Sequence, residues 1–293
     1  MILLLPEAKH VVEKQGRTKP FRAMHFAEDA AGFEALELAK LRFWNRKDIT
    51  LGTAAAEDAL PVHVLHGLPE KQTDNPALYA KQGYCLDIAQ AELTVYYEHR
   101  AGLINALTSL KQLLTPCDGG YTLPLCEITD YPSLETRAIA QTFSWYAGYG
   151  RLGFDSQLWG YEEWVEYLNI CLDNKINQFN LVMYGYWPFD MPGYPETSLR
   201  DVPMKIWNAE NRRWLTVRYT HPNLEEPFLD KFIALAHKLE VKIFAYVGLN
   251  SYNGAYSIKH PEARMKPPAS QGFLNDFDSL CLSYPGTRDY ILE

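Results

Sequence analysis

Three short apolar segments in the second half of the chain alternate with helical patterns. The segments are RAIAQTF (137–143), FNLVMY (179–184) and VKIFAYVGL (241–249). Between them, apolar residues recur at helical spacing over 161–172 and again over 228–239. Strands that are apolar on both faces and separated by helices form βαβ units, in which helices cover a parallel sheet. The spacing therefore predicts a parallel α/β arrangement, with the final PGTRDYILE as the start of a third helix.

Periodicity alone does not distinguish a doubly wound sheet from a (β/α)8-barrel, because both begin with this pattern. The stretch from Gly185 to Pro227, after the second predicted strand, has more than forty residues and is rich in Trp, Tyr, Pro and Asp. Connections that long in a compact domain are usually functional. Barrel enzymes build their active sites at the carboxyl ends of the strands. No G-x-G-x-x-G follows the first strand, which argues against a dinucleotide-binding sheet.

The first half of the chain has the pattern of an α+β domain, a sheet with covering helices. We expect a strand at Ile2–Leu5, a strand at Pro61–Gly67 and a hairpin over 84–97. Helical stripes cover about 30–44 and 101–114, with Gly102 near the start of the second stripe. We place this domain at residues 1–127 and a second, parallel α/β domain at 128–293.

Composition disfavours two classes of partner. The chain has 28 Lys and Arg against 36 Asp and Glu, a net charge of -8, with no basic block, so nucleic acid is a poor partner. No stretch approaches the roughly 18 apolar residues that span a bilayer, so we expect a soluble chain without membrane contact. The opening MILLLPEAKHV lacks a basic region and a cleavage site, and we expect no signal peptide; the native compartment stays open.

Motif searches disfavour cofactor chemistry. The five cysteines are an odd number and most lie in apolar runs, which indicates buried reduced thiols. His99, His221 and His260 have no metal-ligand spacing, so we expect neither a metal nor a cofactor. Neither a G-x-S-x-G elbow nor a P-loop is present, which argues against esterase and phosphoryl-transfer functions.

Two segments resemble family 20 glycoside hydrolases, the β-N-acetylhexosaminidases, and their structural relatives among α-glucuronidases and α-N-acetylglucosaminidases. GYCLDIAQAELTVYYEHRAGLINALTSLKQLL (83–114) is similar to the end of the family's N-terminal non-catalytic domain. ITDYPSLETRAIAQTF (128–143) is similar to the family's entry into the barrel, D-x-P-R-F-x-x-R-G. The resemblance implies an incomplete TIM barrel, of which residues 128–293 form the first three βα units. Because three units cannot close a barrel, we expect a longer natural protein with its catalytic carboxylates beyond residue 293.

Departures from the family pattern leave the substrate open. Ser133 stands at the first Arg of the barrel-entry motif, and Ala138 stands at its Gly. In KINQFNLVMYGYWPF (175–189), Lys175, Asn177 and Phe179 match the family, but its histidines and acidic pair are replaced by Asn180, Val182, Gly185 and Tyr186. The segment FDSQLWGYEEWVEYLNICLDNKIN is closer to the α-N-acetylglucosaminidase and α-glucuronidase side. The resemblance therefore implies a terminal amino sugar or uronic acid as the substrate, without deciding between them.

Eight residues are candidates for carbohydrate binding. The resemblance implies that Arg137 hydrogen-bonds hydroxyls of the terminal sugar; the alternative is a structural role at a domain junction. Aromatic and polar residues at the predicted strand ends suit a sugar, because Trp and Tyr offer an apolar face with a polar edge. They are Trp145, Tyr184, Tyr186, Trp187, Asp190, Asn250 and Tyr252. Ordinary loop packing is the alternative for each, and no catalytic residue is identified.

The pairs Glu162-Glu163 and Glu225-Glu226 fall at helix starts, where carboxylates meet the helix dipole favourably, so we do not assign them to catalysis. The predicted function is that of a part of a glycosidase, β-N-acetylhexosaminidase-like or α-glucuronidase-like, with a carbohydrate substrate. The alternatives are a non-catalytic carbohydrate-binding or scaffold domain, and a fragment without activity of its own.

Overall fold

The computed structural model describes residues 2–54, 56, 58–142, 158–183, 185–247, 253–266 and 279–293. The chain divides into two compact units. The first unit comprises Met1–Arg137, Tyr167–Asn177 and Lys238–Val241, and the second comprises Ala138–Glu166, Gln178–His237 and Lys242–Glu293. Each unit has its own sheet and is described separately.

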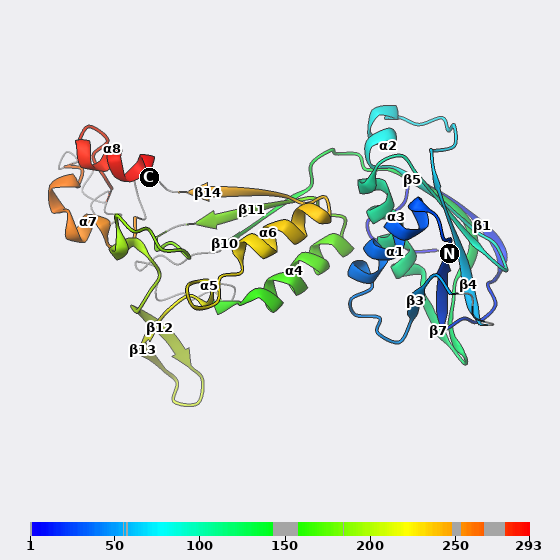
Figure 1. The fold of residues 1–293 in the computed structure, drawn as a ribbon, viewed down its shortest axis with the longest axis horizontal. Coiled ribbons are helices and arrows are strands. Elements are labelled where there is room, and N and C mark those ends of the chain that lie inside the picture. Colours follow the sequence, from blue (N-terminus) through cyan, green and yellow to red (C-terminus); the bar gives the residue numbers. More distant parts are fainter. Residues whose placement is uncertain are drawn as a thin grey trace. The chain divides into compact units, whose positions relative to one another are not determined.

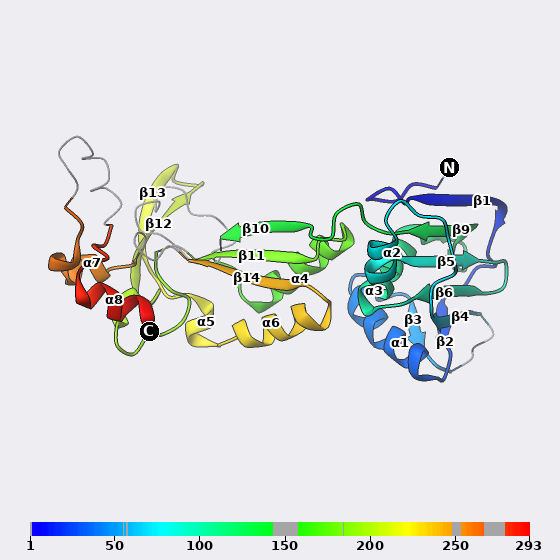
Figure 2. The same ribbon diagram turned by 90° about the horizontal axis from the view of Figure 1, so that it is seen from above.

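The first unit is built on a seven-stranded sheet with the strand order β1-β9-β5-β6-β4-β2-β3 (Figures 1 and 2). Strands β1, β9, β5 and β6 pair antiparallel, whereas β6, β4, β2 and β3 pair parallel. The strands are β1 (His10–Arg17), β2 (Ala23–Phe26), β3 (Thr50–Gly52), β4 (Ala59–His66), β5 (Tyr84–Ile88), β6 (Leu93–Tyr97) and β9 (Pro124–Asp130), with a separate ribbon of β7 (Thr115–Cys117) and β8 (Gly120–Thr122).

Three helices accompany this sheet: α1 (Ala30–Arg42), α2 (Pro76–Gln82) and α3 (Arg100–Leu113). Helices α1 and α3 contact each other and pack on the sheet. The Leu103, Leu107 and Leu110 side chains of α3 are buried, as the stripe predicted. The expected α+β domain with covering helices is confirmed in this unit.

The expected first strand at Ile2–Leu5 is wrong. These residues form no strand, and β1 begins at His10, where the chain pairs with β9. Leu3 and Leu5 are exposed and only Leu4 is buried. A short apolar run therefore did not identify a strand here, because strand formation needs a pairing partner and Ile2–Leu5 has none among the described residues.

The second unit is built on three parallel strands, β10 (Ala138–Thr142), β11 (Gln178–Met183) and β14 (Lys242–Val247), in the order β10-β11-β14. Helices α4 (Tyr161–Asp173) and α6 (Leu229–Lys238) connect them. Phe179 of β11 contacts Phe232 of α6, and Phe232 also contacts Trp164 of α4. The predicted parallel βαβ arrangement is confirmed.

The long connection after β11 is not an irregular loop. It contains a 3-10 turn, η3 (Pro195–Thr197), an antiparallel hairpin of β12 (Val202–Asn208) and β13 (Arg213–Tyr219), and the short helix α5 (Pro222–Glu225). After β14 follow α7 (Tyr256–Lys259), η4 (Pro261–Ala263) and α8 (Pro285–Leu292), the expected third helix. In the described part of the chain, no helix has the length and apolar character to cross a membrane.

The cysteines are free thiols. Cys85, Cys126 and Cys171 are buried, as expected, whereas Cys117 is exposed and Cys281 is intermediate. Burial raises the pKa of Cys126 and of Cys171 to about 11, so both are thiols rather than reactive thiolates near neutral pH.

Candidate functional site

The connection that leaves the carboxyl end of β11 carries three of the predicted site residues that the structure describes. Tyr186 and Trp187 are both buried rather than presented at a surface. Tyr186 packs with Leu199 and Val202. The Trp187 indole nitrogen donates to the Tyr290 hydroxyl at 3.2 Å, and its ring stacks on Phe189 at 5.7 Å. These contacts favour the packing alternative for Tyr186 and Trp187.

Asp190 is an exposed carboxylate that is held by Arg200. The Arg200 Nη2 lies 2.7 Å from Asp190 Oδ2, and Nε lies 3.3 Å from Oδ1. The hydrogen bond from Arg200 lowers the pKa of Asp190 below its ordinary value. A general acid needs a raised pKa. Asp190 therefore suits hydrogen bonds from hydroxyl groups rather than proton donation to a leaving oxygen.

Asp190 lines a cavity of about 370 Å³ at this edge of the second unit. We call it the loop cavity, and its lining residues are Phe189, Asp190, Asn223, Leu224, Pro227, Leu229 and Asp230. The cavity combines two carboxylates with an aromatic ring and aliphatic surface. Such a mixture of an apolar wall and a few polar groups is typical of sites for small hydroxylated ligands.

Asn223 fixes the wall of the loop cavity. Its side-chain amide nitrogen donates to the Pro188 carbonyl at 2.7 Å. Its side-chain oxygen accepts from the backbone nitrogens of Phe228 and Leu229, each at 2.8 Å. Because Asn223 joins the segment after β11 to the start of α6, the residues that carry Asp190 and Asp230 are held on a common frame. Sequence reasoning named Asp190 but missed Asn223 and Asp230, since neither has a distinctive motif around it.

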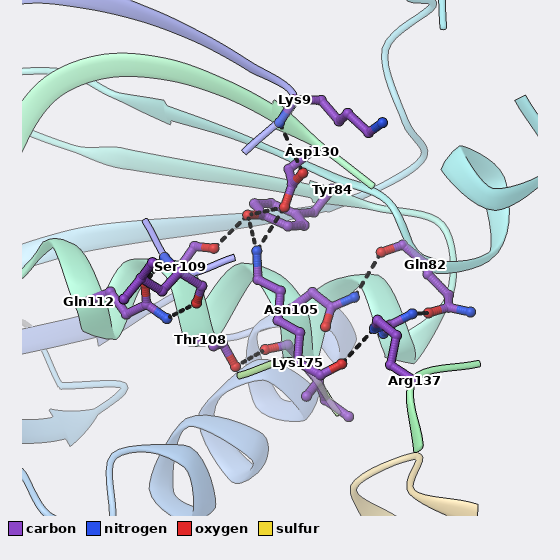
Figure 3. A network of polar contacts seen from close by, with 12 residues as sticks. Lys9, Gln82, Tyr84, Asn105, Thr108, Ser109, Gln112, Asp130, Arg137 and Lys175 are labelled. Carbon is purple, nitrogen blue, oxygen red and sulfur yellow. Dashed lines mark hydrogen bonds and ion pairs between the residues drawn. The ribbon is translucent and has the colours of Figure 1, made fainter. Parts of the chain in front are cut away.

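Arg137 lies in the first unit, immediately before β10 and thus at the amino end of that strand. Figure 3 shows its side chain directed at Gln82 and Lys175. Nε donates to the Lys175 carbonyl at 2.7 Å, and Nη1 donates to Gln82 Oε1 at 2.9 Å and to the Leu134 carbonyl at 2.8 Å. These contacts favour the structural alternative for Arg137, and its contact with a sugar stays a prediction.

Lys175 belongs to a buried polar cluster that the sequence did not reveal (Figure 3). Its ammonium lies 2.7 Å from Asp130 Oδ2 and 3.1 Å from the Tyr84 hydroxyl, which also bonds to Ser109. Burial lowers the pKa of Lys175 and raises that of Tyr84. The sequence signals were the matches of Lys175 and of Asp130, the Asp of the barrel-entry motif, to the family pattern.

A second buried cluster in the first unit joins α1 and α3 to the end of α4. Arg42 is fully buried and pairs with Asp173, and its Nη1 donates to Asn169 Oδ1 at 2.7 Å. Lys111 lies 2.7 Å from the other Asp173 oxygen. Buried charges are stable only when paired, so this cluster holds the end of α4 in the first unit.

The remaining predicted residues, Trp145, Tyr184, Asn250 and Tyr252, lie outside the described residues. Among the described residues, no group of three or more His, Cys, Asp and Glu side chains could hold a metal ion.

Residues 15–131 match the family model described as glycosyl hydrolase family 20, domain 2. This part of the chain is therefore similar to the second domain of family 20 glycosyl hydrolases. The match falls within the first unit and includes the strands from β2 to β9, the three helices and Asp130. No curated protein matches the chain.

Solved structures of family 20 enzymes match the fold of the second unit as well as that of the first. An exo-β-N-acetylglucosaminidase mutant from Vibrio harveyi matches 98% of this chain and 43% of its own, with a TM-score of 0.71 and 14% identity. A β-N-acetylhexosaminidase from Streptomyces coelicolor matches 98% of this chain and 55% of its own, with a TM-score of 0.69 and 15% identity. One from Bacteroides fragilis matches 99% and 52%, with a TM-score of 0.65 and 15% identity. Thus this chain spans about half the length of these structures. The TM-scores show a shared fold, and at such low identities the likeness extends no further than the fold.

Proposed function

We propose that the protein is the N-terminal part of a glycosidase that releases a terminal amino sugar from an oligosaccharide or polysaccharide. The observation that carries the proposal is the fold match, which runs through 98% of the chain and includes both units. The matched enzymes are N-acetylglucosaminidases and N-acetylhexosaminidases, and one is solved with N-acetylglucosamine bound. The proposal is therefore confined to amino sugars, since no comparison supports a uronic acid.

In this proposal the second unit is the beginning of a (β/α)8-barrel. The faces of its sheet support this view. Phe179 and Leu181 are fully buried, and α6 packs on Phe179. Phe244 and Tyr246, paired with the intervening positions of β11, are 53% and 58% exposed. Closing the strands into a barrel would bury this opposite face in the interior, and the catalytic carboxylates would come from later strands.

The loop cavity is the proposed contact with the sugar in this chain. It opens among residues of the segment that follows β11, on the side where barrel enzymes bind substrates. Asp190 is an anion held by Arg200, and it would accept hydrogen bonds from sugar hydroxyls, with Phe189 against an apolar face of the ring. Its role is binding, not chemistry.

The test is hydrolysis of aryl N-acetyl-β-glucosaminides and N-acetyl-β-galactosaminides by the full-length natural protein. We expect turnover, and we expect Asp190→Asn to raise KM by about tenfold with little change in kcat, as for a group that binds substrate and transition state equally. Asp201→Asn is the matched control, because Asp201 also pairs with an arginine but does not line the loop cavity. Inactivity on every amino-sugar substrate would reject the proposal.

A non-catalytic carbohydrate-binding domain is the second candidate. It is supported by the replacement of the family's histidines and acidic pair with Asn180, Val182, Gly185 and Tyr186. Calorimetric titration with N-acetylglucosamine oligosaccharides separates the two functions, since binding without turnover by the full-length protein would favour the second.

A further inference from the structure

The β12–β13 hairpin has two chemically different faces. Ile206, Val217 and Tyr219 pack against the buried cluster of Tyr186, Leu199 and Val202. The side chains on the other face are all exposed; this outer face consists of Pro203, Lys205, Trp207, Trp214, Thr216 and Arg218. Figure 1 shows the hairpin as a ribbon that extends away from the parallel strands of the same unit. The outer face is therefore exposed to solvent.

Two tryptophans occupy the end of the outer face nearest the turn. Trp207 and Trp214 are directly opposite each other on the two strands, with ring centroids 5.6 Å apart and ring planes at 62°. Cross-strand aromatic pairs stabilise hairpins, so the pair has a structural role. That role does not need solvent-exposed indoles, yet Trp207 is 51% exposed and Trp214 is 47% exposed. Exposed aromatic area of this kind marks binding surfaces.

The hairpin is cationic in an anionic chain. Residues 202–219 contain Lys205, Arg212, Arg213 and Arg218 against the single acid Glu210, a local charge of +3 in a chain of -8. Arg218 is neutralised by Asp201 through a bidentate contact. Within the described part of the chain, Lys205, Arg212 and Arg213 have no ion-pair partner. Arg213 pairs with Asn208 on the opposite face, so Lys205 and the turn residue Arg212 are the two cations beside the indoles that remain available to a ligand.

We propose that this surface, made of Lys205, Trp207 and Trp214 of the outer face and Arg212 of the adjoining turn, binds an anionic polysaccharide. The indoles would stack on apolar faces of sugar rings, and the cations would bind carboxylate or sulfate groups along the polysaccharide. The proposal rests on the proposed function, because it adds that the sugar units of the substrate that follow the terminal amino sugar carry negative charge. Nucleic acid fits less well, since a phosphate every few ångströms calls for a denser set of cations than the two beside the indoles.

The experiment measures binding of the full-length protein to chondroitin sulfate by calorimetry, with chitin oligosaccharides as a neutral comparison. We expect saturable binding to chondroitin sulfate that weakens as salt increases. The Trp207→Ala/Trp214→Ala variant should bind at least about tenfold more weakly, by analogy with aromatic stacking on nucleic-acid bases. Phe33→Ala is its control, because Phe33 is an exposed aromatic of the first unit and is 52% exposed.

A second variant keeps the proposal testable if loss of the tryptophans unfolds the hairpin. Lys205→Glu/Arg212→Glu leaves the indole pair intact and should abolish binding to chondroitin sulfate, whereas Lys47→Gln, which changes an exposed cation in the first unit, should not. Unchanged binding in both hairpin variants would overturn the proposal, as would equal affinity for single-stranded DNA or for anionic lipid vesicles. Since no readout depends on turnover, failure of binding in a protein that hydrolyses aryl amino sugars would reject this inference alone.

Discussion

At the scale of single residues, Lys175 has a backbone conformation that usually belongs to glycine. Its φ is +56°, and it follows the last turn of α4. The Lys175 nitrogen donates to Leu172, and the Ile176 nitrogen donates to Cys171, which is the pattern of a Schellman helix end. A non-glycine residue there costs about 1 kcal/mol. The buried ion pair with Asp130 offers a physical reason for a lysine at this position.

We predict that Lys175→Gly destabilises the first unit, although glycine suits the backbone better. Removing one partner of a buried ion pair lowers the free energy of unfolding by about 3 to 5 kcal/mol. Relief of the positive-φ backbone strain offsets about 1 kcal/mol of this loss. The net loss should be about 2 to 4 kcal/mol in urea unfolding. Glu240→Gly is the control, because Glu240 also has a positive φ, of 57°, but is exposed. A stabilised Lys175→Gly variant would contradict this account.

At the scale of secondary structure elements, α3 depends on a glycine for packing rather than for flexibility. A Cβ placed on Gly102 would lie 2.1 Å from the Gly83 carbonyl oxygen, which follows α2. Glycine inside a helix costs about 1 kcal/mol relative to alanine. The close approach of these two backbone segments explains why it is tolerated here.

Gly102→Ala should therefore destabilise the protein, in contrast to the usual gain from alanine in a helix. We expect a loss of about 1 to 3 kcal/mol, because backbone atoms must move to admit the methyl group. Ala101→Gly in the same turn tests propensity alone and should cost about 1 kcal/mol. Chemical denaturation of both variants measures the difference, and a Gly102→Ala variant more stable than the parent would show that the contact is not tight.

At the scale of the whole molecule, the division into two compact units predicts that unfolding is not a single transition. Each unit has its own sheet, and the buried clusters around Lys175 and Arg42 lie within the first unit. Differential scanning calorimetry should give a calorimetric enthalpy larger than the van't Hoff enthalpy.

The same calorimetry assigns the transitions. Lys175→Gly should lower one melting temperature, and Phe232→Ala, which removes a buried ring of the second unit, should lower the other. A single transition that shifts equally in both variants would show that the units unfold together.

The sequence by itself determined the elements whose burial is periodic. The stripe of α3, the hairpin of β5 and β6 and the parallel strands β10, β11 and β14 were readable because the spacing of apolar residues reports which face is buried. The family resemblance correctly predicted the kind of domain that the first unit is, since its motif over residues 83–114 lies within the segment that matches the family model.

Only the tertiary structure decided which polar side chains meet. Asp173 is 131 residues from Arg42, and Asp130 is 45 residues from Lys175. The predicted sugar contacts Tyr186 and Trp187 turned inward because the connection after β11 folds on itself around Leu199. Local pattern specifies that a segment is a helix or a strand, but the partner of a charged or aromatic side chain depends on chain segments that the fold brings together from far apart.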